Sequence, residues 1–123
     1  MSSAQYLQKF QKNLIDFLDE LVEQFPEEEE IIMANLLIKT QIPVKMVIDK
    51  FIQFFIPNID LIKTRDDRFF LSENDIFSQI NPNKSGTLKR IWKSRNIDDE
   101  DREIIWSWIE TLVSITMKYQ NSI

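Results

Sequence analysis

The chain has 123 residues, a formal net charge of −5, and neither histidine nor cysteine. The chain therefore lacks histidine, the side chain best suited to proton transfer near neutral pH, and cysteine, the most reactive ordinary nucleophile. It also lacks the two commonest zinc ligands, which are the same two residues. The single glycine, Gly86, excludes the glycine-rich turns that bind nucleotide phosphates. We expect a non-enzymatic protein with no catalytic residues, no cofactor and no metal site.

One compact domain over residues 1–123 is predicted from the length and from a hydrophobic content of 43%. No apolar run is long enough to span a bilayer, so we expect no membrane association. Residues 1–5 do not resemble a signal peptide. These features indicate a soluble intracellular protein.

Helical periodicity dominates the first half of the chain. A first helix is predicted over residues 4–24, where apolar residues recur every three or four positions, and Pro26 ends it. A second helix begins with the glutamates at 27–30 and runs to about residue 39. It is apolar nearly all round, which places it either centrally in the core or beneath a partner chain. A third helix runs from Pro43 to Pro57 and has a wide apolar face that includes Met46, Phe54 and Ile56.

The second half of the chain has shorter predicted elements. Residues 58–71 are expected to be the least regular stretch, with Phe69, Phe70 and Leu71 returning the chain to the core. Ser72 is predicted to cap a short helix that ends near residue 80, with Asp75 as its capping-box partner. Further helices are predicted over residues 86–94 and 99–120, the last one capped by Asp98. The predicted fold is all-α, a compact single-domain bundle of five to seven helices.

A basic segment at residues 84–95 holds five cations, no acidic residue and Trp92. One interpretation is a nucleic-acid or phosphate site, in which the cations contact the backbone and the indole stacks on a base. The other is a solvated helix face with Trp92 in the core. A third is a surface for an acidic protein partner. The cations are Lys84, Lys89, Arg90, Lys93 and Arg95.

A partner-binding surface is the alternative that we favour. Trp106 and Trp108 are two positions apart and point to different sides of the last helix, and exposed aromatic residues are enriched at interfaces. Trp106 is either such an interface residue or part of the core edge. Together with Phe54 and Phe55, the two tryptophans are the predicted contacts for a protein partner or for a second copy in a homodimer.

Metal binding is not predicted from the acidic or loop motifs. Residues 81–88 resemble the start of an EF-hand loop, but the calcium-binding carboxylates are missing at the required positions. The acidic runs at residues 27–30 and 98–103 are explained by the favourable position of carboxylates at helix N-termini. The run at 27–30 has a second interpretation, a surface for a basic partner.

Two sequence segments carry a resemblance to a known group of proteins. Residues 17–26 read FLDELVEQFP and residues 105–112 read IWSWIETL. In this pattern the chain resembles, over about residues 14–119, small acidic helical proteins of nucleocytoplasmic large DNA viruses, a family without an assigned biochemical activity. The resemblance implies a viral structural or host-interaction role, located in the virion or in the host cytoplasm (the viral factory), and carries over no catalytic residue.

Overall fold

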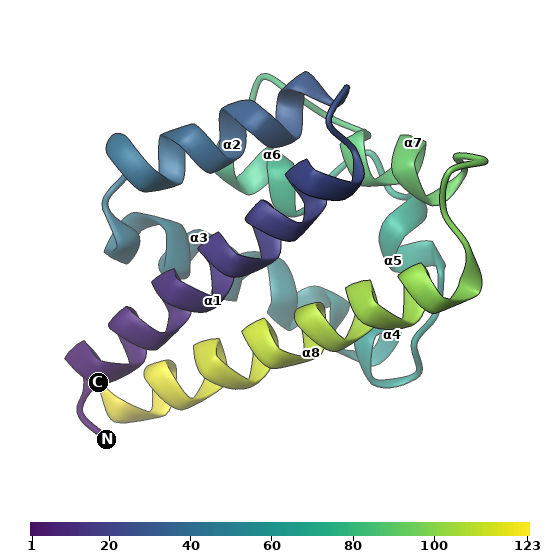
Figure 1. The fold of residues 1–123 in the computed structure, drawn as a ribbon. Helices are drawn as coiled ribbons and strands as arrows, with labels where there is room; N and C mark the ends of the chain where they lie inside the picture. Colours follow the sequence, from purple (N-terminus) through teal and green to yellow (C-terminus); the bar gives the residue numbers. More distant parts are fainter.

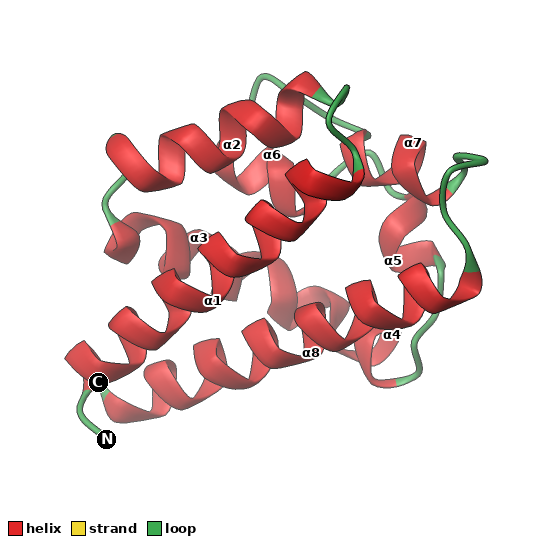
Figure 2. Cartoon of the chain, viewed as in Figure 1, coloured by secondary structure: helices red, strands yellow, loops and turns green.

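The computed structural model describes residues 1–123 and contains only helices and loops (Figures 1 and 2). The predicted all-α fold is confirmed. Seven α-helices have at least five residues, and α5 is a single turn of four. The elements in chain order are α1 (Ser3–Gln24), α2 (Glu29–Thr40), α3 (Val44–Phe55), the 3₁₀-helix η1 (Ile56–Asn58), α4 (Ile59–Lys63), α5 (Arg68–Leu71), α6 (Ile76–Ile80), α7 (Thr87–Trp92) and α8 (Asp99–Ser122).

The two longest helices, α1 and α8, form an antiparallel pair that brings the two ends of the chain close together (Figure 1). Both begin with a capping box. Ser2 caps α1 together with Gln5, and Asp98 caps α8 together with Asp101, as predicted for Asp98. Because these caps satisfy backbone N–H groups that have no partner within the helix, they define where each helix starts.

The remaining helices pack around this pair and enclose one core. α2 turns back across α1, α3 contacts α1, α6 and α8, and α5 packs against α7. Aromatic rings connect these elements in a nearly continuous series, with neighbouring centroids between 3.9 and 6.2 Å apart. The series consists of Phe10, Phe51, Phe55, Phe54, Phe69, Phe70, Trp92 and Trp106.

Residues 58–71, the stretch expected to be least regular, contain the two short helices α4 and α5, which the sequence pattern did not predict. Phe69 and Phe70 lie in the core, as predicted. Pro57 does not end the helical path. It lies in the first turn of η1, where its missing N–H would have no helical partner in any case. The side-chain amide of Asn58 donates to the carbonyl of Phe54 at 2.8 Å, so a carbonyl at the end of α3 also has a partner.

The predicted cap at Ser72 lies three residues too early. Asp75 itself is the N-cap of α6, and its side chain accepts hydrogen bonds from the backbone N–H groups of Phe77 and Ser78. Ser72 instead accepts from the N–H of Asn74 in the preceding turn. Both residues are good acceptors for turn amides, so the sequence pattern alone did not distinguish them.

Candidate interaction surface

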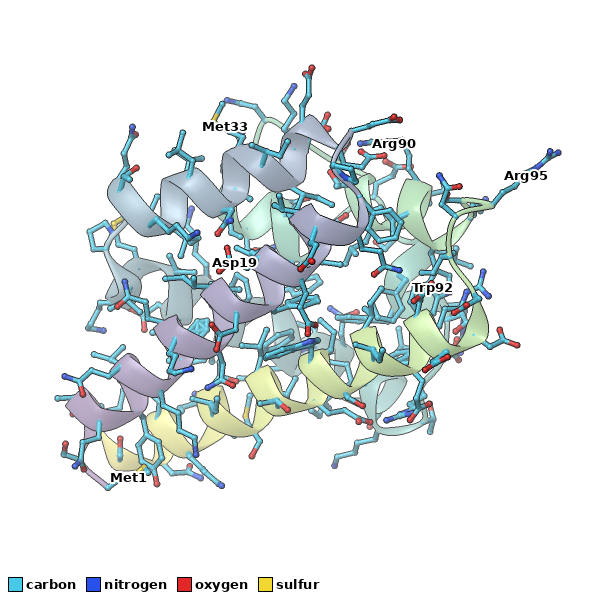
Figure 3. All side chains as sticks on the ribbon, viewed as in Figure 1. Met1, Asp19, Met33, Arg90, Trp92 and Arg95 are labelled. Atoms are coloured by element: carbon cyan, nitrogen blue, oxygen red, sulfur yellow. The ribbon has the colours of Figure 1, made fainter.

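The outer side of α2 carries three large apolar side chains in solvent. Ile32, Met33 and Leu36 keep 43%, 47% and 51% of their surface exposed. Residues three or four positions apart lie on the same side of a helix, and Figure 3 shows Met33 on the side of α2 that faces away from the body. We call these three residues the α2 apolar face. The helix is therefore peripheral, so the first of the two alternatives for it, a central place in the core, is wrong, and the second, cover by a partner chain, stays a prediction.

A groove adjoins the α2 apolar face on the side of α6. It has a volume of about 550 Å³ and lies between α2, the end of α6 and the loop that follows α6. Met33 belongs both to the α2 apolar face and to the groove wall, so the two apolar surfaces are continuous. The groove is lined by Met33, Leu37, Ile42 and Ile80, with Glu29, Glu30, Asn81 and Lys84 around them.

The two ends of α2 carry opposite charges. At its N-terminal end, Glu29 is exposed and makes no ion pair, whereas Arg90 Nη2 donates to Glu28 Oε2 at 3.2 Å and to Glu30 Oε2 at 3.3 Å. These ion pairs connect the start of α2 to α7, whereas Glu29 is free to form an ion pair with another molecule.

At the C-terminal end of α2, Lys39 is the last basic residue. Its ammonium donates to Asp19 Oδ1 of α1 at 2.8 Å, and the amide of Asn35 donates to the same oxygen at 2.9 Å. These two hydrogen bonds, that of Lys39 first, lower the pKa of Asp19 below its ordinary value. The contacts hold α2 against α1 with the α2 apolar face directed outward.

Phe54, Phe55 and Trp106, predicted as partner contacts, lie in the core instead. For Phe54 and Trp106 the reason is α5, a helix that the sequence pattern did not indicate: Phe69 packs against Phe54 and Phe70 packs edge-on against Trp106. Phe55 packs against Phe51 and Phe54 of its own helix. The prediction that these three residues form a partner-binding surface is therefore corrected.

Trp108, the fourth predicted contact, is half-buried between α1 and α8. Its indole stacks on Phe17 with centroids 5.7 Å apart, and its Nε1–H donates to Glu20 Oε2 at 2.6 Å. A tryptophan that uses both its ring face and its N–H within the fold is a helix-packing residue.

Two of the five cations in the basic segment form ion pairs within the fold, and the other three do not. Lys89 pairs with Glu73 at 3.1 Å, and Arg90 pairs with α2 as described above. Lys84, Lys93 and Arg95 are exposed and make no ion pair; Arg95 extends from the loop before α8 (Figure 3).

Trp92, the predicted stacking platform, lies in the core between α7 and α8 (Figure 3). It stacks on Phe70 with centroids 3.9 Å apart and planes inclined by 13°. The guanidinium of Arg102 lies over the Trp92 ring, 5.6 Å from the ring centroid. Trp92 therefore does not present a free ring face to a nucleobase.

Ile104 is the exposed apolar residue that offers the best comparison with the α2 apolar face. It is 45% exposed and borders two shallow depressions, one with Glu20, Glu23 and Gln24 and one with the half-buried Trp108, and it is the only strongly exposed apolar side chain in either. A single exposed apolar side chain is ordinary on a protein surface. The three adjacent residues on α2 differ because they form one surface with a groove.

No group of three or more metal-binding side chains comes together in the structure, and no helix has the length and apolar character needed to cross a membrane. No protein-family model, curated protein or solved structure matches this chain.

Proposed function

We propose that this protein acts without catalysis, by binding a protein chain through the α2 apolar face and the adjoining groove. The observation that carries this proposal is the adjacency of Ile32, Met33 and Leu36 in solvent next to an apolar groove. Burial of apolar surface stabilises a complex by about 25 cal/mol per Å² before the costs of association are subtracted. A helix face of this kind is a common docking surface for another helix.

Nucleic-acid binding by residues 84–95 is the weaker candidate. Lys89 and Arg90 are paired with acidic side chains, and an acidic neighbour opposes the approach of phosphate. The net charge of −5 adds a general repulsion toward a polyanion. Trp92 is engaged with Phe70, so base stacking would require the core to open.

The sequence resemblance to viral proteins extends this proposal. If the protein is viral, a structural protein of the virion or a host protein becomes a further class of partner for the α2 apolar face. The viral origin stays a prediction.

Site-specific photo-cross-linking tests the proposed function. A benzophenone amino acid is placed at position 36 in cells that produce the protein, and a matched variant carries it at position 104, where the native side chain is similarly exposed. We expect a discrete adduct from position 36 and none from position 104. Absence of an adduct at position 36, or the same adducts from both positions, would contradict the proposal.

A further inference from the structure

We infer that the occupant of the α2 apolar face is a second copy of this chain, packed with the two α2 helices antiparallel about a two-fold axis. This inference rests on the proposed function and specifies its partner. It is supported by the order of charges along the outer side of α2 and by the side chains that are free at each end.

The outer side of α2 has an acidic end, an apolar centre and a basic end. Glu29 comes first, the α2 apolar face follows, and Lys39 lies in the last turn. A two-fold axis midway between Met33 and Leu36 would pack each Met33 against the Leu36 of the second copy. The same axis would place each Glu29 opposite position 40 of the second copy, within one residue of its Lys39 and within reach of that long side chain. Such self-complementarity is what a closed two-fold interface requires.

A parallel arrangement is opposed by the same charges. It would bring together two runs of four glutamates at residues 27–30. In the antiparallel arrangement these runs are separated by about the length of the helix, roughly 18 Å at 1.5 Å per residue. The helix dipoles also favour this orientation, because the positive end of one helix lies beside the negative end of the other.

Glu29 and Lys39, the charged groups needed for the contact, can each form a further ion pair beyond those made within the single chain. Glu29 makes no ion pair, whereas its neighbours Glu28 and Glu30 are engaged by Arg90. The Lys39 side chain is 43% exposed and makes one ion pair, with Asp19. An ammonium group has three N–H donors. Two donors therefore remain for Glu29 of a second copy.

The size of the surface predicts a weak dimer. A contact made by one twelve-residue helix from each copy is small and falls at or below the lower end of specific interfaces, which is about 1,200 Å² in total. We therefore expect a dissociation constant of tens of micromolar, on the order of −6 kcal/mol in binding free energy. Dimerisation should depend on protein concentration over this range.

Sedimentation equilibrium of the purified full chain tests the inference, over concentrations from about 5 to 500 μM, which bracket the expected constant. The average mass should rise from 14.7 kDa toward twice that value. Leu36→Glu should keep the protein monomeric, because it places a charge at the centre of the contact. Ile104→Glu, at an exposed position away from α2, should dimerise like the unchanged chain.

Charge exchange tests the antiparallel register. Lys39→Glu also removes the ion pair with Asp19 within the chain, so it is made together with Asp19→Lys. Glu29→Lys, and separately the Asp19→Lys/Lys39→Glu variant, should each raise the dissociation constant about three- to tenfold. The variant with all three changes should restore much of the loss, because the pair between the two copies is re-formed with opposite polarity. Circular dichroism checks that each variant folds. A combined variant that dimerises no more tightly than the other two would overturn the register.

The outcomes separate this inference from the proposed function. A wild-type chain that stays monomeric at every concentration, or a Leu36→Glu variant that dimerises normally, overturns the inference. If the cross-linker at position 36 then captures a different protein, the proposed function stands while the dimer does not. If it captures no chain at all, both are wrong.

Discussion

The carboxylate of Asp75 accepts a hydrogen bond from the backbone N–H of Leu88 at 2.9 Å, across thirteen positions of sequence. Its other oxygen accepts from the N–H groups of Phe77 and Ser78 at 2.9 and 3.1 Å. One side chain, only 1% exposed, therefore caps the starts of both α6 and α7. Helices of five and six residues are not stable on their own, so this shared cap links two elements that depend on tertiary contacts.

We predict that Asp75→Asn lowers the free energy of unfolding by about 1–3 kcal/mol, the cost of leaving a buried polar group unsatisfied. The amide keeps one acceptor oxygen for α6 but turns an NH₂ group toward the N–H of Leu88. Urea unfolding at neutral pH measures the loss. The matched control is Asp98→Asn at the exposed cap of α8, which should change stability by less than about 0.5 kcal/mol. Equal effects at both sites would contradict the shared-cap interpretation.

The pH dependence of stability provides a second test of Asp75. Burial raises its pKa above the ordinary value of 3.8, and the hydrogen bonds from Leu88, Ser78 and Phe77 oppose part of the rise. The folded state therefore keeps a proton that the unfolded chain has already lost. Stability from this group is fully present below pH 3.8 and is lost as the pH rises through the folded-state pKa. Carboxyl NMR titration checks the direction; a pKa at or below 3.8 would refute it.

Asp66 should behave in the opposite way. Two hydrogen-bonding groups of Arg68, first its guanidinium and then its backbone N–H, lower the pKa of Asp66 to about 2. The stability contributed by this carboxylate is present above its ordinary pKa of 3.8 and is lost as the pH falls toward 2. Arg68→Met should raise the pKa part of the way back, because the backbone N–H remains. Arg95→Met, which removes a cation without an ion pair, should leave the pKa of Asp66 unchanged in the same NMR titration.

Gly86→Ala should destabilise the start of α7. Gly86 has a φ of +69°, and a Cβ atom at this position would lie 2.5 Å from Glu73 Oε2. We expect the free energy of unfolding to fall by about 1–2 kcal/mol because alanine is strained in the left-handed backbone conformation; thermal unfolding measures the loss. Adding Glu73→Ala should remove the loss due to the steric clash and leave the loss due to the backbone conformation. A Gly86→Ala variant as stable as the unchanged chain would contradict the assigned backbone conformation.

The basic segment should give no specific nucleic-acid complex. We expect fluorescence anisotropy with labelled single- and double-stranded DNA to show only weak binding at low salt. Replacing Lys84, Lys93 and Arg95 together by alanine should reduce that residual signal, because these cations make no ion pair in the fold. Tight binding that depends on Lys89 and Arg90 would instead show that their ion pairs open, and would favour the nucleic-acid function.

The long helices were predictable from the sequence, and the short ones were not. The predicted ranges 4–24 and 99–120 differ by at most two residues at each end from α1 and α8, because many turns of periodic apolar residues define a long helix. α4 and α5 have five and four residues, too few for a helical period to be recognised. Their formation depends on contacts with η1 and α7.

The candidate surface was only partly predictable for a related reason. The sequence shows that α2 is apolar nearly all round, but it does not show which side faces the core. In α3, Met46 is exposed while Phe54 is buried. The difference depends on Phe69 of α5, which packs against Phe54. Exposure is a property of the tertiary arrangement, so the sequence located the apolar helices and the structure located the free face.

The positions of the tryptophans determine which parts of the protein spectroscopy can follow. Trp92 and Trp106 lie 6.2 Å apart with their planes at 84°, in the junction of α5, α7 and α8, whereas α2 contains no tryptophan. Emission and near-ultraviolet circular dichroism will therefore report melting of this junction and, through Trp108, of the contact between α1 and α8. They will be nearly silent to events on α2. A dye attached through a new cysteine on α2 would be the sole thiol label in the chain, since the natural sequence has no cysteine.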